Sequence, residues 1–400
     1  MKLGYKQTEA GVIPEEWEVM SVYEFATVIT GGTPKTEVQA YWKGHYAWVT
    51  PTDITEQRDM WVSERMISES GLSSIRQLPP NTVLVTCIAS IGKNAILRSV
   101  GGCNQQINAL IPKQENSSEF LYYTFESSKQ YLLANAGMTA THIISKAAFE
   151  QLKFPIPPLP EQRAIAEALS DVDGLLGGLD RLIAKKRDLK LAAMQQLLTG
   201  QTRLPGFHGE WEVKTLRSVF EIMAGKSMSA YISDGGDFVI CDMGSVSTEG
   251  RLIKTKRTNY RGDFLREGDL VMPKDDIGGG KIIGRVGYVD CSELYVLGDH
   301  VYRLRAIEGD PLFLSYLINS HSINSALRKK VIGSAQLGLG RRSVEEQEIP
   351  FPSTAEQTAI AQILSDMDAE LTALEQQREK TRALKQAMMQ ELLTGKTRLV

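Results

Sequence analysis

A single stretch occurs twice in this chain: EQRAIAEALSDVDGLLGGLDRLIAKKRDLKLAAMQQLLTGQTRL at residues 161–204, and EQTAIAQILSDMDAELTALEQQREKTRALKQAMMQELLTGKTRL at residues 356–399. The copies align without a gap at an offset of 195 residues, and 25 of their 44 paired positions are identical. Similarity at a fixed offset indicates an internal structural repeat. We therefore expect two halves that share one order of elements.

Both copies predict a long helix, because apolar residues recur at alternating spacings of four and three. This heptad seam keeps one apolar edge towards a partner helix, and it is formed by Ile165, Leu169, Val172, Leu176, Leu179 and Ile183 in the first copy, and by Ile360, Leu364, Met367, Leu371 and Leu374 in the second. Pro160 suits a helix start, and Gly200 and Gly395 suit helix ends. A helix of roughly 38 residues spans about 57 Å. We predict that the two helices bury their seams against each other as an antiparallel coiled coil; an ordinary core pair without a spacing role is the alternative.

Two segments of mixed character flank these helices. Both open with EWEV, at residues 16–19 and 210–213, and both continue with short β-type runs, such as residues 82–88, 270–272 and 281–289. Each then predicts a short helix, at residues 118–135 and 311–330, and ends in a proline-rich approach to the long helix. The predicted fold is α+β with a pseudo-twofold repeat: globular mixed α/β domains at residues 1–158 and 205–353, joined by long helices at residues 159–204 and 354–400.

The composition is that of an ordinary globular protein, with 42% apolar and 23% charged residues. No run of 18 apolar residues and no signal peptide is apparent, so we expect a cytoplasmic protein without a membrane span. The four cysteines lack CxxC spacing, and we expect them to be reduced and structural. A net charge of −3 neither indicates nor excludes a nucleic-acid partner, but basic residues cluster at residues 251–261 and 328–342.

The motifs of catalysis are missing from the sequence. GGGK at residues 278–281 is followed by Ile282 where a phosphate-binding loop requires Ser or Thr. PKDD at residues 273–276 is better explained as loop charge than as a nuclease metal site, and the five histidines show no ligand spacing. The glycine-rich loop and Asn-Pro-Pro-aromatic tetrad of a DNA amino-methyltransferase are also missing. We predict no catalytic residue, no metal and no cofactor in this chain.

The doubled helix, with its PxPPLxEQxxIAxxL entry and QxLLTGxTRL exit, and the EWE opening of each half resemble the specificity subunits of Type I restriction-modification enzymes. The resemblance covers the whole chain. It implies that each globular domain is a target-recognition domain for one half of an asymmetric, bipartite double-stranded DNA target. It also implies that the helices set the spacer and dock two methyltransferase subunits, which restriction/translocase subunits join. S-adenosylmethionine is then expected in the methyltransferase, and ATP and Mg²⁺ in the restriction subunits.

Candidate DNA-binding residues in the first domain follow from that resemblance and from their chemistry. Glycines let the backbone approach phosphate, hydroxyls and amides bond phosphates or base edges, and Lys93 is a phosphate candidate. The alternatives are a core position for Trp42 and Trp48 and a structural turn for Asn104 and its neighbours. The predicted set is Gly32, Thr33, Lys35, Tyr41, Trp42, Thr50, Asp53, Ser90, Lys93, Asn104, Gln105, Thr139, Thr141 and His142.

The second domain departs from the family pattern, since GDH at residues 298–300 replaces NQQ. Arg341 and Arg342 are the best candidates for base contacts, because a guanidinium can bond guanine through two hydrogen bonds or hold a phosphate. The predicted set is Lys226, Ser227, Lys274, Lys281, Arg285, His300, Gln336, Arg341 and Arg342.

The helix copies also suggest a surface for partners. Because the copies are alike, one kind of partner should bind twice, in a two-to-one complex. The predicted partner-binding residues are Lys186, Lys190, Gln195, Arg382, Lys385 and Gln390; a solvated helix face is the alternative. A rival function is a non-catalytic coiled-coil scaffold whose terminal domains bind proteins rather than DNA.

Overall fold

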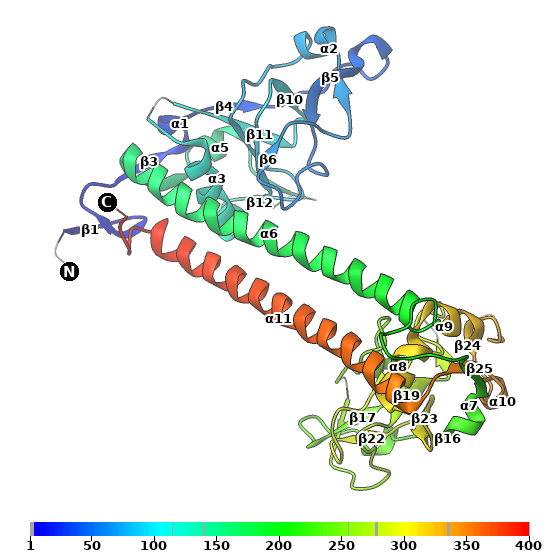
Figure 1. The fold of residues 1–400 in the computed structure, drawn as a ribbon. Helices are drawn as coiled ribbons and strands as arrows, with labels where there is room; N and C mark the ends of the chain where they lie inside the picture. Colours follow the sequence, from blue (N-terminus) through cyan, green and yellow to red (C-terminus); the bar gives the residue numbers. More distant parts are fainter. Residues whose placement is uncertain are drawn as a thin grey trace. The chain divides into compact units, whose positions relative to one another are not determined.

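The structure is a computed structural model that describes residues 4–113, 115–138, 141–254, 256–276, 279–333 and 337–399. It divides into two compact units: unit 1 comprises Met1–Asp180 and Gln376–Val400, and unit 2 comprises Arg181–Glu375. Both divisions fall within long helices, α6 (Leu159–Leu197) and α11 (Thr354–Leu392) (Figure 1). Each unit therefore contains a globular part and one segment of each long helix.

Unit 1 is built on a five-stranded sheet with the order β4-β11-β8-β9-β6 (Ala26–Thr30, Ile107–Pro112, Thr82–Thr86, Asn94–Leu97 and Asp59–Met60). A three-stranded sheet, β10-β5-β7, comprises Gly101–Cys103, Trp42–Val49 and Met66–Ile67. The pairs β10–β5 and β6–β9 are parallel, and the other pairs in these sheets are antiparallel. The smaller strands are β1 (Tyr5–Thr8), β2 (Gly11–Pro14), β3 (Glu18–Ser21), β12 (Gly137–Met138), β13 (His142–Ile143) and β14 (Lys153–Ile156), and the helices are α1 (Val22–Phe25), η1 (Gln39–Tyr41), α2 (Glu69–Ser73), α3 (Ser118–Ser127), α4 (Lys129–Ala134) and α5 (Lys146–Glu150).

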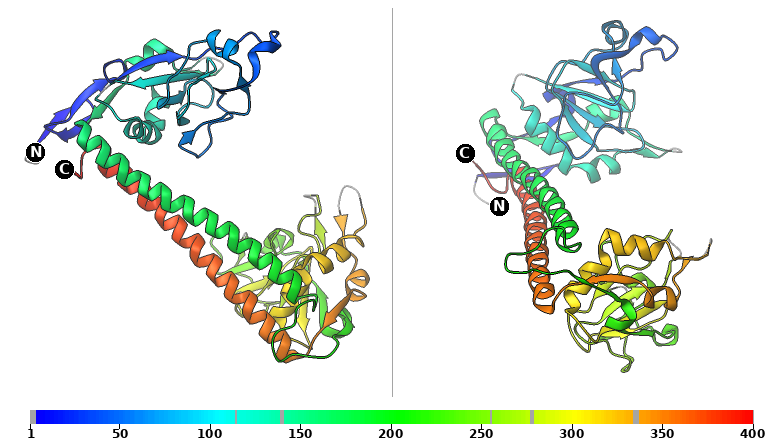
Figure 2. Two further views of the ribbon diagram at one scale, coloured as in Figure 1. Left: turned by 45° about the horizontal axis from the view of Figure 1, so that its top comes forward. Right: turned by 45° about the vertical axis from the view of Figure 1, so that its right-hand side comes forward.

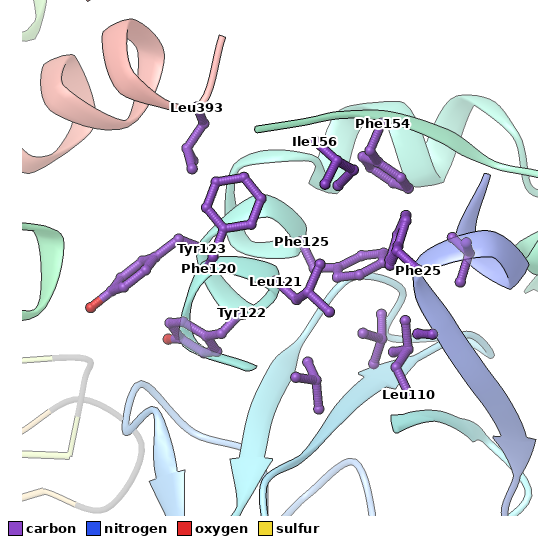
Figure 3. Packing of buried hydrophobic residues seen from close by; sticks show 14 of the residues in the cluster. Phe25, Leu110, Phe120, Leu121, Tyr122, Tyr123, Phe125, Phe154, Ile156 and Leu393 are labelled. Atoms are coloured by element: carbon purple, nitrogen blue, oxygen red, sulfur yellow. The ribbon is translucent and has the colours of Figure 1, made fainter. Parts of the chain in front are cut away.

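The five-stranded sheet of unit 1 is buried on both faces. Alternate residues such as Val83 and Leu110 belong to one cluster with the aromatic residues of α3, whereas Leu84 and Ala109 belong to the cluster shared with the three-stranded sheet. This division follows the period-2 alternation of a strand. Figure 3 shows Leu393, which follows α11, beside the side chains of α3. The long helices are therefore part of the core of unit 1.

Unit 2 repeats this plan with one strand fewer in its larger sheet. Its four-stranded sheet has the order β16-β23-β19-β21 (Phe220–Ala224, Val301–Ala306, Leu270–Pro273 and Gly287–Tyr288), and its three-stranded sheet has the order β18-β17-β22 (Lys256–Thr258, Phe238–Cys241 and Tyr295–Leu297). The smaller strands are β15 (Glu212–Thr215), β20 (Asp275–Asp276), β24 (Leu337–Gly338) and β25 (Glu348–Phe351), and the helices are α7 (Leu216–Val219), η2 (Ser229–Tyr231), η3 (Met243–Ser245), α8 (Pro311–Asn319), α9 (His321–Arg328) and α10 (Arg341–Glu345). The β15–β25 pair corresponds to β3–β14 of unit 1.

Two predicted elements differ from the observed ones. The helix expected at residues 118–135 is interrupted at Ser128, whose φ of −99° and ψ of 14° are not helical and whose hydroxyl donates to the Thr124 carbonyl at 2.6 Å. A serine hydroxyl competes with the backbone for such carbonyls and favours a helix break. The β-type run at residues 281–289 forms a strand only at Gly287–Tyr288, because Gly284 adopts a φ of +72° that a regular strand cannot accommodate.

Within each unit the two long helices lie side by side in all three views (Figures 1 and 2). Ion pairs give their direction: Asp173 pairs with Lys385 and Asp180 with Arg378 in unit 1. Residue numbers rise along one helix as they fall along the other, so the segments run antiparallel. In unit 2 the same order holds, since Lys186 pairs with Glu370 and Lys190 with Asp368. Seam residues are buried in both units, among them Ile165, Leu169, Leu179, Ile183, Ile360, Leu364 and Leu371.

Each long helix ends before the predicted segment does, at Leu197 and Leu392. Three residues later, Gly200 and Gly395 each adopt a φ of +70°, a left-handed conformation that costs glycine little and ends a helix. A side chain at Gly395 would also meet Pro14, and one at Gly200 would meet the ring of Trp211. The repeated LLTG therefore turns the chain back onto the tryptophan of an EWE sequence.

That turn leads into a clamp, a name we use for three contacting side chains in each unit. In unit 1 the carboxylate of Glu161, which is 0% exposed, accepts hydrogen bonds from Trp17 Nε1 at 2.8 Å and from Arg398 Nε and Nη2 at 2.5 and 2.9 Å. These bonds raise the pKa of Arg398, which also bonds Glu16.

The clamp of unit 2 uses the matching residues of the repeat. Glu356, which is 1% exposed, accepts from Trp211 Nε1 at 3.1 Å and from Arg203 Nε and Nη2 at 2.6 and 2.7 Å. The tryptophan of EWE, the glutamate of EQ and the arginine of TRL are thus explained by one contact made twice. In each unit the arginine follows one long helix and the glutamate lies at the start of the other.

The thiols are expected to resist alkylation in the native protein. Burial raises the pKa of Cys87, Cys103 and Cys241 to about 12, so almost no thiolate is present at neutral pH. Cys291 is only half-buried, and all four are free. We expect iodoacetamide at pH 8 to label Cys291 first and the other three only after denaturation, as measured by peptide mass spectrometry. Equal labelling of all four without denaturant would contradict this assignment.

Candidate nucleic-acid interface

The loops that carry the predicted residues of unit 1 are linked to one another by hydrogen bonds. Gly32 N donates to the Cys103 carbonyl at 2.8 Å, and Asn104 N donates to the Val49 carbonyl at 2.9 Å. The chain at residues 31–35 therefore lies against residues 103–106, which lie against the end of β5. Segments that are far apart in the sequence meet at one end of the sheets.

The same set of loops includes the β8–β9 turn and β13. Lys93 is exposed, and its Nζ lies 3.3 Å from the Pro51 carbonyl. Ala89 N donates to the carbonyl of His142 at 3.1 Å, which places the exposed Ser90, Thr141 and His142 next to that turn. Thr139 lies outside the described residues. The structure therefore brings most of the candidates of unit 1 to one surface.

Glycine is required where two of these loops cross. A Cβ on Gly31 would overlap the backbone carbonyl oxygens of Cys103 and Asn104. This close crossing brings Thr33 to the exposed Gln105, whose Oε1 accepts from the threonine hydroxyl at 2.7 Å. A hydroxyl and an amide are thus presented together, and both can bond phosphates or base edges.

Several candidates of unit 1 are engaged in supporting the loops. Asn104 is 8% exposed, and its side chain bonds Gln106 through both its nitrogen and its oxygen, which is the structural-turn alternative. Asp53 accepts from Thr50 N at 2.8 Å and from Glu64 N at 2.7 Å, so its carboxylate organises a turn. Trp48 is a core residue, 4% exposed, and donates to the Gly32 carbonyl.

Arg65 also belongs to this surface, although no motif in the sequence pointed to it. Its guanidinium lies 3.7 Å from the ring centre of Trp42 and 5.1 Å from that of Trp48, and the two rings pack edge to face. Trp42 is half-buried, and its Nε1 donates to the carbonyl of the exposed Lys35 at 3.3 Å; Tyr41, just before it, is also half-buried. A stacked arginine keeps its charge free for an anion.

Unit 2 repeats the crossing of loops with different side chains. A Cβ on Gly225 would overlap the carbonyl oxygen of Gly298, so residues 225–227 lie against residues 298–300. Lys226 and Ser227 follow this glycine and are exposed. A cavity of about 350 Å³ beside them is lined by Ser227, Asp242, Lys256, Asp299 and His300, among others.

Lys274 and the segment that leads to Arg341 and Arg342 lie next to His300. Its Nδ1 lies 2.7 Å from Asp275 Oδ2, and its carbonyl accepts from Lys274 N at 3.0 Å. Lys274 in turn accepts from Leu339 N at 2.7 Å, just before Arg341 and Arg342 at the start of α10. Both arginines are exposed, and each forms an ion pair one helical turn away, with Glu345 and Glu346 respectively.

Two residues of the predicted set of unit 2 do not join this group, and one cannot be assigned. Arg285 donates to the Asn319 carbonyl at the end of α8 at 2.6 Å, and it lines a separate cavity beside the long helices. Burial lowers its pKa. Lys281 is exposed, without a described contact to the group. Gln336 lies outside the described residues.

The predicted partner-binding residues fall into two classes. Lys190 and Lys385 are largely covered, with side chains 18% and 12% exposed, and their ammonium groups bond carboxylates of the same unit. Gln195 and Gln390 are exposed, Lys186 pairs with Glu370, and Arg382 pairs with Glu379. The exposed class remains a prediction for partner contacts.

The described part of the chain contains neither a metal-binding cluster nor a membrane-spanning helix. No group of three His, Cys, Asp or Glu residues there could hold a metal ion. Among the same residues, no helix is long and apolar enough to cross a membrane.

Comparison with known proteins gives a consistent result. The Type I restriction modification DNA specificity domain matches twice, at residues 14–183 and 208–382. The chain is 27% identical over 421 residues to the Type I restriction enzyme MjaVIII specificity subunit of Methanocaldococcus jannaschii, covering 99% of this chain and 96% of that protein. It is 33% identical to the MjaIX specificity subunit of the same organism, over 43% of this chain and 41% of that protein.

Solved structures share the fold. The Type I restriction-modification S subunit of M. genitalium has a TM-score of 0.61 at 16% identity, covering 94% of this chain and 96% of that one. The HsdS subunit of Thermoanaerobacter tengcongensis has a TM-score of 0.52 at 16% identity, covering 96% and 98%. Because the two domain matches together span most of the sequence, this chain belongs to the Type I restriction modification DNA specificity domain family.

Proposed function

We propose that this protein is the DNA-recognition subunit of a Type I restriction-modification complex, in which each unit reads one half of an asymmetric bipartite target. The observation that carries the proposal is that unlike polar loops gather at the same place on a repeated frame. Thr33, Lys93 and Gln105 occupy this place in unit 1, and Lys226, His300 and Arg341 occupy it in unit 2. Different side chains on one frame suit two different half-sites.

We also propose that α6 and α11 form one antiparallel coiled coil with pseudo-twofold symmetry, which sets the spacer. A protein that contacts two half-sites must hold its readers at a separation fixed by the duplex. The ion pairs and buried seams that both units share support this arrangement. A stiff helix pair can fix such a separation, whereas a flexible linker cannot.

The partners follow from the family and from the repeat. Two copies of a methyltransferase subunit would bind the matching exposed faces near Gln195 and Gln390, and restriction/translocase subunits would join them. In this proposal the chain itself is not catalytic: S-adenosylmethionine is bound by the methyltransferase, and ATP and Mg²⁺ by the restriction subunits. The DNA target places the complex in the cytoplasm.

The proposal is tested by single-molecule methylation sequencing. A methylation-free host would carry the presumed methyltransferase partner with or without this chain. We expect a two-part asymmetric motif that is methylated only when the chain is present, because the half-sites are read here. If the partner is expressed and bound but no motif appears, the protein is instead a scaffold.

Two substitutions should separate backbone contacts from base contacts. Lys93→Ala should weaken binding to all sequences alike and lower the slope of log affinity against log salt by about one, because one phosphate contact is lost. Arg341→Ala should cost about 1–3 kcal/mol at one base pair of the second half-site. Fluorescence anisotropy with single-base-pair variants of the target, over a salt series, measures both. A uniform loss for Arg341→Ala would exclude base contact by that residue.

A further inference from the structure

Each unit contains a polar network that joins its recognition domain to both long helices. In unit 2 the hydroxyl of Tyr316, on α8, donates to Asp368 Oδ2 of α11 at 2.8 Å. Lys190, on α6, donates to both oxygens of the same carboxylate at 2.7 and 2.6 Å, and its ammonium lies 5.2 Å from the centre of the Tyr316 ring. One carboxylate thus connects three elements.

Unit 1 contains the same network with the two long helices exchanged. The hydroxyl of Tyr123, on α3, donates to Asp173 Oδ2 of α6 at 2.7 Å, and Lys385 of α11 contacts Asp173 Oδ1 at 2.9 Å. The Lys385 ammonium lies 5.4 Å from the centre of the Tyr123 ring and also bonds Glu126 of α3. In Figure 3 the Tyr123 side chain ends in a hydroxyl that points away from the hydrophobic cluster.

The sequence repeats this network even though the domains around it differ. Asp173 and Asp368, and likewise Lys190 and Lys385, are separated by the 195-residue offset. The tyrosines occupy corresponding places, in FLYY on α3 and FLSY on α8. Each network also has an arginine from its own domain: Arg58 bonds Tyr123 and Ser170, and Arg251 lies 3.4 Å from Asp368.

The position of each network along its helix explains what it does. A recognition domain is first attached at the helix start, where Gln162 accepts from Ser117 N at 2.9 Å and Gln357 accepts from Asp310 N at 2.8 Å. Asp173 and Asp368 lie eleven residues further on, which is about 16 Å along a helix. Between these two points, apolar helix residues such as Ile165 and Leu364 already pack into the domain cores. The network adds a directional polar attachment further along the helix, where it opposes rotation about the helix start.

A small pivot would matter to DNA. A rotation of about 10° at a radius of roughly 20 Å, the size of such a domain, moves its surface by about 3.5 Å, close to the 3.4 Å rise of one base pair. We infer that the Tyr123–Asp173–Lys385 and Tyr316–Asp368–Lys190 networks position the recognition domains on the long helices and thereby determine which spacer length the protein accepts. This inference rests on the proposed function, since a spacer exists only in a two-part target.

The network can be weakened without unfolding the protein. Asp173 and Asp368 are partly exposed, at 30% and 27%, so their loss does not open a hydrophobic core. Asp368→Asn keeps an oxygen for the Tyr316 hydroxyl and removes the charge that holds Lys190. Asp366→Asn is the matched control, because Asp366 is exposed, lies on the same helix and bonds only Gln362 in the described contacts.

The experiment uses the full chain in complex with its methyltransferase partner. Methylation rates are measured on DNA with the preferred spacer and with spacers one base pair shorter and longer. For Asp173→Asn, Asp368→Asn and Tyr316→Phe we expect discrimination against the altered spacers to fall at least about tenfold, the effect of losing one charge-assisted hydrogen bond. All variants should still methylate the same half-site sequences. The Asp366→Asn control should discriminate between spacer lengths as the unaltered protein does.

Three results would contradict these expectations in distinguishable ways. Unchanged spacer discrimination in the Asp173→Asn/Asp368→Asn double variant would overturn the positioning role. So would an equal fall in rate on all three spacers, because that pattern indicates general weakening. If the unaltered protein directs no methylation to any two-part target, the proposed function itself fails and the inference fails with it.

Discussion

Arg398→Ala is expected to destabilise unit 1 by about 3–5 kcal/mol, the cost of leaving a buried charge without its partner. Glu161 is fully buried, and Arg398 supplies two of its three hydrogen bonds. Without the guanidinium, only the Trp17 indole would remain to stabilise this carboxylate. The loss of stability in unit 1 is measured by hydrogen exchange. Exchange of peptides from β1–β3 and α3 is compared with exchange of peptides from unit 2.

Two variants control for simpler explanations of that loss. Lys396→Ala removes a positive charge from an exposed site two residues away, and it should change stability by less than about 0.5 kcal/mol. Adding Glu161→Gln to Arg398→Ala should restore part of the loss, because a neutral amide can still accept from Trp17 Nε1. If unit 1 is as well protected from hydrogen exchange in the Arg398→Ala variant as in the Lys396→Ala variant, the clamp is not a stabilising contact.

Gly225→Ala should weaken DNA binding through the second half-site by roughly 5- to 150-fold. The new Cβ would overlap the backbone oxygen of Gly298, and because neither atom belongs to a flexible side chain, the loops must move apart. Overpacking makes the original arrangement of the loops about 1–3 kcal/mol less favourable. DNA binding must restore that arrangement, so the affinity falls by the same free energy. The displaced loops carry Lys226, Ser227 and His300 of the proposed interface.

Gly340→Ala is the matched control in the same group of loops. Its φ of −63° suits alanine, and the nearest atom to an added Cβ is the Ser343 hydroxyl at 3.9 Å. We expect the Gly340→Ala variant to bind DNA with the same affinity as the unaltered protein. Competition binding with targets altered in one half-site or the other separates the two domains. If Gly225→Ala weakened binding to both half-sites equally, the contact between Gly225 and Gly298 would not organise a local DNA-binding surface.

The sequence was most informative where a physical constraint acts along the chain. The heptad seam predicted which faces of the long helices are buried, because Ile165, Leu169 and Leu364 follow helix periodicity. The short strands around β8 were also expected from their β-branched residues. The break at Ser128 was missed because it depends on how one hydroxyl is used.

Contacts between segments that are distant in the sequence could not be predicted from local patterns. Arg65 stacks on Trp42 only because β5 and β7 pair across a bulge, and nothing local to Arg65 indicates that pairing. Lys190 and Lys385 resemble solvent-exposed helix residues in the sequence, but α8 and α3 cover them. Arg285 matched the chemistry expected for DNA, yet the turn before β21 directs its guanidinium to the carbonyl at the end of α8.

The clamps show which covalent connections this architecture needs. In unit 2 a short peptide joins Arg203 to Trp211. In unit 1 Arg398 and Trp17 come from opposite ends of the sequence and meet at Glu161, and the Tyr5 hydroxyl donates to the Gly395 carbonyl. The same three side chains meet in both places, with and without a local link. The order in which a gene encodes the two halves is therefore not fixed by the folded state. Duplication, fusion and exchange of halves would all preserve the contacts that hold each recognition domain in place.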